Sequence, residues 1–103
     1  MTILREWRAE IRRELCKEYV EYVEATGIAA YRESSGNLGA TIATRDLDET
    51  RSEIVVLSWW TNRDAIREFA GDAIEIARYF PKDDAFLLTR PNFVQHYESE
   101  APR

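Results

Sequence analysis

The sequence predicts an α+β fold of the ferredoxin-like type, with the element order βαββαβ and a four-stranded antiparallel sheet. Three observations lead to this prediction. First, a segment in which side chains alternate as in a strand precedes a segment with helical periodicity. Second, two further strand patterns are separated by a polar turn. Third, the second of these strands runs directly into another helical segment, and a last short strand follows. In this topology the first and third strands are central, and both helices lie on one face of the sheet.

Residues 3–9 alternate as a strand does, although both of its faces carry charge. In residues 12–26 apolar side chains recur at helical spacing between charged ones, which predicts an amphipathic helix. Gly27 stands where a helix commonly ends, so we expect the helix to stop there and a short apolar extension, 28–31, to follow.

Residues 38–45 predict a second strand of small side chains, and residues 53–60 predict a third, with the polar turn 46–51 between them. The third strand is apolar on both faces, which is typical of a central strand covered on both sides. Its two faces carry Val55, Leu57 and Trp59 on one side, and Ile54, Val56 and Trp60 on the other.

Helices on one face leave the other face of this strand without cover. A second copy of the same sheet is the simplest cover, so we expect a homodimer that associates through its sheet faces. The alternative is a monomer whose own loops fold over that face.

The second helix is expected to begin at Thr61 as the capping residue, with Asp64 in its first turn. An apolar stripe continues over residues 66–77 and is interrupted by Gly71. A glycine inside a helix costs about 1 kcal/mol, so we expect a break, a kink or a close backbone contact there. A short helical turn over 82–88 and a last strand over 92–98 complete a single domain, 1–98, before a polar tail, 99–103.

Composition excludes several classes of function. With 103 residues there is room for one core, and a net charge of −5 with interspersed signs offers no basic face for nucleic acid. The longest apolar runs fall far short of the roughly 20 residues that a membrane helix needs. The charged N-terminal segment is no signal peptide, so a cytoplasmic location is expected.

No metal is expected. Asp83 and Asp84, with Glu68 or Asp72, are typical of a solvated surface rather than a metal site. Cys16 is the single cysteine, which excludes an intrachain disulfide; it is either a packing residue or a catalytic thiol, and no base lies near it in sequence.

His96 and Arg5 are the candidate catalytic residues. His96 is the only histidine, and it either accepts a proton from a phenol or hydroxyquinone as a general base or is a half-buried structural residue. Arg5 lies on a central strand, where a charge requires a cavity or a partner. It either holds an anionic oxygen or a carboxylate, or it forms an ion pair between strands, for example with Glu53 or Glu98.

Aromatic side chains suit the walls of a pocket for a flat ring, and they are equally typical of a core. Trp59 and Trp60 point to opposite faces, so at most one of them lines a given pocket. The substrate-binding candidates are Trp60, Trp7, Tyr79 and Phe80.

Three segments resemble the antibiotic biosynthesis monooxygenase family of the dimeric α+β barrel superfamily. They are residues 57–71 (LSWWTNRDAIREFAG), 79–84 (YFPKDD) and 94–98 (VQHYE), and the resemblance covers nearly the whole chain. Members include cofactor-independent oxygenases of aromatic polyketides, haem-degrading oxygenases and proteins of unassigned role. The resemblance implies a dimer of face-to-face sheets with a ligand cavity in each protomer, between its sheet and its helices.

The chain departs from the haem-degrading members. Trp60 is similar to their tryptophan at the end of the third strand, but the second helix has no histidine, and the first strand offers Arg5, Glu6 and Trp7 in place of an asparagine. Haem is therefore not expected. The resemblance implies a monooxygenase without a cofactor that binds a planar aromatic or quinone-type molecule; the alternative is a non-catalytic binding or structural dimeric module.

Overall fold

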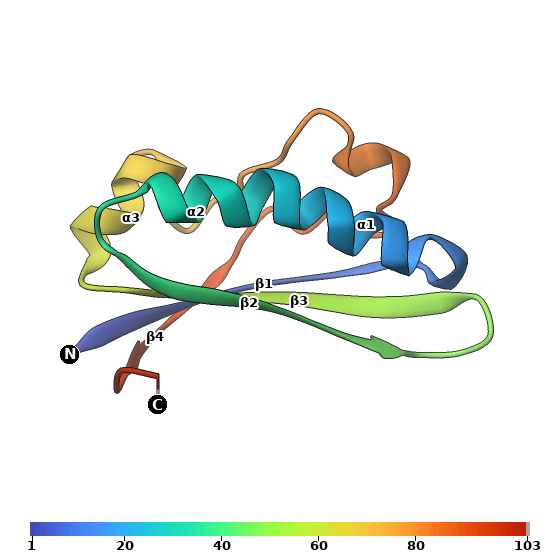
Figure 1. Ribbon diagram of the computed structural model, residues 1–103, viewed down its shortest axis with the longest axis horizontal. Helices are drawn as coiled ribbons and strands as arrows, with labels where there is room; N and C mark the ends of the chain where they lie inside the picture. The colour runs from blue at the N-terminus through green and yellow to red at the C-terminus, as the bar shows by residue number, and fades with distance from the viewer. Residues whose placement is uncertain (103) are drawn as a thin grey trace.

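A computed structural model of the chain describes residues 1–102. Its four strands are β1 (Thr2–Arg12), β2 (Asn37–Asp46), β3 (Arg51–Trp60) and β4 (Gln95–Ser99). They form one antiparallel sheet in the order β2-β3-β1-β4. Figure 1 shows the helices packed on one face of this sheet. The predicted ferredoxin-like fold is confirmed, with β1 and β3 as the central strands.

The two faces of β3 differ in burial. Ile54, Val56 and Trp60 point toward the helices and are at most 4% exposed. Val55 and Leu57, on the other face, are only partly buried. The strand thus has the two-sided apolar pattern that the sequence predicts, but within one chain only one side is covered.

The first helical segment is longer than predicted. A 3-10 turn (Arg13–Leu15), α1 (Cys16–Val23), a π-helical turn (Glu24–Ile28) and α2 (Ala29–Glu33) follow one another without interruption. The prediction that Gly27 ends the helix is wrong. Ile28 and Tyr31 are buried against the sheet, and this packing outweighs the roughly 1 kcal/mol cost of a helical glycine.

The last helix, α3 (Arg63–Ala70), begins one residue later than expected. Asn62, not Thr61, caps it, because the Asn62 side chain accepts a hydrogen bond of 2.9 Å from the backbone N–H of Ala65. Thr61 instead donates its backbone N–H to the carbonyl of Gly36 at 3.0 Å, which fixes the end of β3 to the start of β2.

Gly71 ends α3, which confirms the predicted break, and its φ of 84° is a conformation that favours glycine. The prediction that the helical stripe continues to residue 77 is wrong. Residues 72–78 form no helix and pair with the segment before β4, through bonds from Ala77 N to Asn92 O (2.8 Å) and from Val94 N to Glu75 O (2.9 Å). The predicted short turn after residue 81 is present as a 3-10 turn, Asp83–Ala85.

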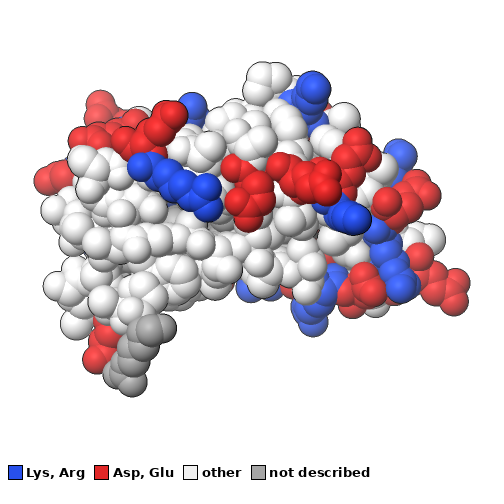
Figure 2. Space-filling model, viewed as in Figure 1, with Lys and Arg blue, Asp and Glu red and all other residues white. Residues whose placement is uncertain are grey.

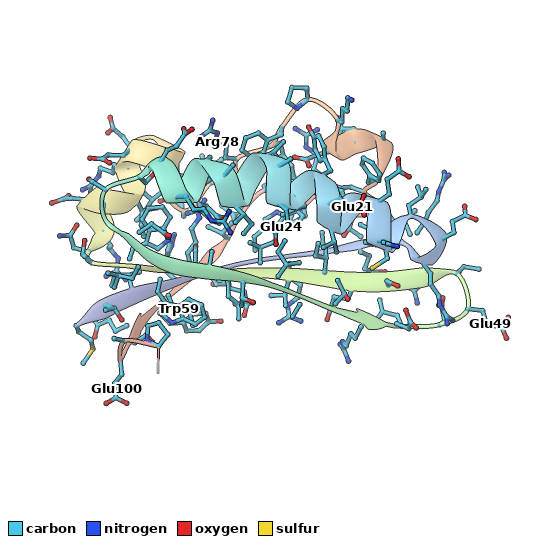
Figure 3. The ribbon with its side chains drawn as sticks, viewed as in Figure 1. Glu21, Glu24, Glu49, Trp59, Arg78 and Glu100 are labelled. Atoms are coloured by element: carbon cyan, nitrogen blue, oxygen red, sulfur yellow. The ribbon has the colours of Figure 1, made fainter. Side chains whose placement is uncertain are left out.

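The sheet face opposite the helices is open. Leu4 lies between Trp59 and Tyr97 on this face, and Leu57 lies next along β3. Figure 3 shows Trp59 pointing away from the helices.

Farther toward the β2–β3 turn the open face carries charge instead: Arg8 and Arg45 both bind Glu53 at 2.8 Å. Arg8 also lies 3.6 Å from Glu6, so it forms ion pairs with two carboxylates of its own chain. Figure 2 likewise shows charged side chains gathered along α1 and near that turn. Among the described residues, no helix has the length and apolar character needed to cross a membrane.

Candidate functional site

Arg5 is the most unusual buried residue. It points from β1 toward the helices and is 2% exposed. Its Nη1 donates a hydrogen bond of 2.6 Å to the carbonyl of Ile74 and lies 3.0 Å from His96 Nε2. Burial lowers the pKa of its guanidinium, an effect that Tyr31 partly opposes.

Arg5 has no acidic partner. No carboxylate among the described residues lies within 4 Å of its guanidinium, so the alternative of an ion pair with Glu53 or Glu98 is not realised. Glu53 lies on the opposite face of the sheet, where it binds Arg8 and Arg45. A buried cation whose hydrogen bonds go to a carbonyl and an imidazole keeps its full positive charge available to a ligand.

His96 stands opposite Arg5 on β4, in register with it. Burial lowers the pKa of His96 from 6.5 to about 4, with further lowering by Arg5 and Arg63 and a small opposing effect of Glu75. The imidazole is therefore neutral at neutral pH. Because Arg5 can only donate, His96 Nε2 accepts, and the ring proton is assigned to Nδ1.

A small pocket lies between the sheet and the helices, and Arg5 forms part of its wall. It encloses about 40 Å³, whereas ligand sites usually measure several hundred Å³. Aromatic rings make up much of the lining: Trp7, Tyr19, Tyr31, Phe69 and Phe80. The aromatic lining suits a flat ring, but the free volume of the pocket is smaller than such a ring.

The structure brings some of the predicted site residues together and separates others. Arg5, Trp7 and Phe80 line the pocket, whereas His96 is not part of its lining and lies behind Arg5, which it contacts. Tyr79 lies behind Trp7, whose Nε1 donates to the Tyr79 hydroxyl at 3.4 Å.

Trp60 is fully buried and is not part of the pocket lining. Its ring packs against Tyr31 and Phe69 at centroid distances of 5.5 and 6.2 Å, and its Nε1 donates to Ser58 at 2.8 Å. In this conformation it supports the pocket from within the core.

Sequence reasoning did not identify two polar groups of the pocket, and its prediction that Asp83 belongs to a solvated surface is wrong. Asp83 is 5% exposed and accepts hydrogen bonds from the Tyr19 hydroxyl (2.9 Å) and from the backbone N–H of Phe80 (2.6 Å). Burial, followed by the nearby Asp83, raises the pKa of Tyr19. The sequence could not separate this buried aspartate from its exposed neighbour Asp84, because both stand in one polar run.

Arg78 is the second group that was missed. Its guanidinium lies over the rings of Phe69 and Phe80, 4.9 Å from each centroid, and donates to the carbonyl of Phe69 at 2.9 Å. Figure 3 shows this side chain on the helix side of the sheet. The prediction of a helix through residue 77 gave no reason to place Arg78 beside Phe69 and Phe80, so this contact was not foreseen.

No group of three or more His, Cys, Asp or Glu side chains in residues 1–102 is arranged to hold a metal ion. Cys16 is partly buried and packs against the core, in agreement with its interpretation as a packing residue.

The fold has clear counterparts among solved structures. A provisionally assigned antibiotic biosynthesis monooxygenase from Bacillus cereus superposes with a TM-score of 0.68 at 12% identity, covering 99% of this chain and 98% of the other. SnoaB, a cofactor-independent oxygenase from Streptomyces nogalater, gives a TM-score of 0.59 at 16% identity, covering 98% and 95%. A second provisionally assigned antibiotic biosynthesis monooxygenase, from Bacteroides thetaiotaomicron, gives 0.56 at 14% identity, covering 97% and 89%.

No family model and no curated protein matches the sequence. At these identities the structural likeness shows the fold alone, and it does so over nearly the whole chain.

Proposed function

We propose that the protein is a cofactor-independent monooxygenase that binds a planar aromatic or quinone-type molecule between its sheet and its helices. The observation that carries the proposal is Arg5, a buried cation without an acidic partner, in the wall of an aromatic-lined pocket. The fold shared with monooxygenases supports it. We expect the protein to act in the cytoplasm.

Arg5 is the residue that holds an anionic oxygen of the ligand. A phenol that loses its proton becomes an electron-rich anion that can react with oxygen, and a fixed guanidinium stabilises that anion most where water is excluded. Arg5 meets both conditions, since it is 2% exposed and anchored to Ile74.

His96 is the general base of the proposal. In the free protein its one basic nitrogen, Nε2, accepts from Arg5, and burial, followed by the charge of Arg5, lowers the pKa of His96 to about 4, so the imidazole does not take a proton. An anionic ligand that draws the Arg5 hydrogen bond to itself frees Nε2, offsets the positive charge and raises the pKa of His96 toward its ordinary value. Ligand binding would thus prepare the base for proton transfer.

Trp7 and Phe80 provide the walls, and the pocket must widen before a ring can enter. Phe80 is only partly buried and lies beside the exposed Arg78, so displacement of these two side chains is the least costly way to enlarge it. Tyr79 positions Trp7 through their hydrogen bond. Trp60 becomes a wall if Tyr31, which packs against it, moves aside.

We further propose a homodimer that associates through the open face of the sheet. The support is the apolar set on that face, in which Leu4, Leu57, Trp59 and Tyr97 are neighbours across three strands. An exposed apolar patch of this kind, with charged residues beside it, is typical of an interface. Each protomer would keep its own pocket on the far side of its sheet.

Oxygen uptake with 1,5-dihydroxynaphthalene tests the activity. The balanced reaction consumes one O₂, places one oxygen atom on the ring to give 5-hydroxy-1,4-naphthoquinone, and releases the other as water, so it needs no external reductant. We expect quinone formation above the rate without protein, and a loss of about 10²-fold in His96→Ala. Full turnover in His96→Ala would remove the base assignment, and no turnover by the wild type with this compound bound would contradict the enzyme proposal.

The second candidate is a non-catalytic module, and the small size of the pocket favours it. An enclosed space of about 40 Å³ is close to a pocket filled by its own side chains. The burial of Arg5 favours the enzyme, because a cation without a carboxylate partner is costly in a purely structural wall. Binding of the naphthalene compound without oxygen uptake would support the module.

A further inference from the structure

Two guanidinium groups line the pocket, and neither has an acidic partner. Arg5 and Arg78 both belong to its wall, and no carboxylate within residues 1–102 lies within 4 Å of either group. The hydrogen bonds of Arg5 go to Ile74 O and His96, and that of Arg78 goes to Phe69 O. The pocket therefore carries positive charge that the protein does not neutralise by contact.

The carboxylate of Asp83 in the same lining is already engaged. One of its oxygens accepts from Tyr19 and the other from the backbone N–H of Phe80. These bonds direct it toward the helix and the 3-10 turn, so it does not pair with Arg5 or Arg78.

The two arginines approach the same ring. The Cζ atom of Arg5 lies 5.7 Å from the centroid of the Phe69 ring, and that of Arg78 lies 4.9 Å from the same centroid. Tyr31 packs against Phe69 with the rings tilted and their centroids 4.5 Å apart, and the charges of both arginines act on its hydroxyl.

We propose that the pocket binds an aromatic carboxylate, whose carboxylate group is held between Arg5 and Arg78 with the Tyr31 hydroxyl as a third donor. This inference rests on the proposed function and names the chemical class of its ligand: the carboxylate binds the N–H groups of Arg5 that face Arg78, and the ring oxygen binds the side of the guanidinium that faces His96. Arginine forks match the geometry of carboxylates, and a site that excludes water strengthens the pairing. Burial raises the pKa of Tyr31, so its hydroxyl remains a donor at neutral pH.

The volume of the pocket agrees with a ligand whose carboxylate lies inside it and whose ring lies beside it. A carboxylate group is small enough for the enclosed 40 Å³, whereas the ring must occupy the space that Phe80 now fills. Arg78 is exposed, and when it turns toward the anion it gives up its bond to Phe69 O and its contacts with the Phe69 and Phe80 rings. Arg5 is fixed by burial, so Arg78 is the residue that adapts.

Isothermal titration with 2-naphthoate and 2-naphthol tests the proposal, because the two have the same ring system and only the first is charged at neutral pH. We expect 2-naphthoate to bind at least tenfold more tightly. Arg78→Gln should lose about tenfold in affinity for 2-naphthoate and little for 2-naphthol, since the affected hydrogen bond is charge-assisted. Arg32→Gln, an exposed arginine on α2 next to Glu24, is the matched control for a general change of charge.

Acetate is the third probe, since it has the carboxylate and lacks the ring. Equal affinities for 2-naphthoate and 2-naphthol, with no effect of Arg78→Gln, would overturn the carboxylate proposal and leave the aromatic site intact. Binding of acetate without binding of either naphthalene compound would support the anion site and overturn the proposed function. Binding of none of the three, with thermal melts showing folded protein, would overturn both.

Discussion

His96 should make the protein less stable as the pH falls from about 6.5 to about 4. Its pKa lies near 6.5 when the chain is unfolded and is lowered to about 4 by burial, Arg5 and Arg63 in the fold, with Glu75 opposing. Between these values the unfolded chain binds more protons, so acidification favours unfolding. The loss of stability is complete below the pKa of the folded protein, about 4, and absent above the pKa of the unfolded chain, 6.5.

The magnitude follows from the shift. A change from 6.5 to about 4 corresponds to about 3 kcal/mol at 1.36 kcal/mol per pKa unit. Because the imidazole is only partly buried, solvent screening reduces the expected effect to about 1–2 kcal/mol. His96→Gln keeps a side-chain oxygen that can accept from Arg5 and does not titrate, so it lacks this contribution.

Urea unfolding of both proteins between pH 4 and pH 7 measures the difference. The carboxylates titrate in both proteins, and their contributions cancel when one curve is subtracted from the other. We expect the wild type to lose about 1–2 kcal/mol more than His96→Gln over this range. Parallel curves would show that burial beside Arg5 does not lower the pKa of His96 in the folded protein.

Three other substitutions test separate contacts. Tyr19→Phe removes the donor to buried Asp83 and should cost about 1–3 kcal/mol in urea unfolding, with circular dichroism unchanged; no loss would show that solvent satisfies this carboxylate. Trp59→Glu places a charge on the open sheet face and should reduce a mass of about twice 12.0 kDa to that of one chain in light scattering, whereas a wild type already monomeric at micromolar concentration would refute the dimer. Gly36→Ala would bring a Cβ to 2.2 Å from Ala65 Cβ and should destabilise by about 1–3 kcal/mol, measured as a lower melting temperature; an unchanged melt would contradict the close approach.

Strand periodicity made much of the fold predictable. Alternation along β1 and the two-sided apolar character of β3 are local properties, and they sufficed to identify both strands as central. The same alternation places Arg5 on the side of Ile3 and Ala9, which is why a buried cation could be anticipated before its neighbours were known.

The errors arose where distant contacts decide the local structure. Gly27 is tolerated inside a helix because Ile28 is buried beyond it, and the segment after Gly71 is extended because it pairs with residues near Asn92. The position of Arg78 over Phe69 depends on that pairing as well. No local pattern reports such contacts, so the second arginine of the pocket could be found only in the structure.

A crystal structure of the protein grown with 2-naphthoate shows whether the two arginines hold the anion. We expect the carboxylate against Arg5 and Arg78, and the ring between Trp7 and a displaced Phe80. A pocket still closed to about 40 Å³ at saturating ligand, with 2-naphthoate bound elsewhere or absent, would contradict this expectation.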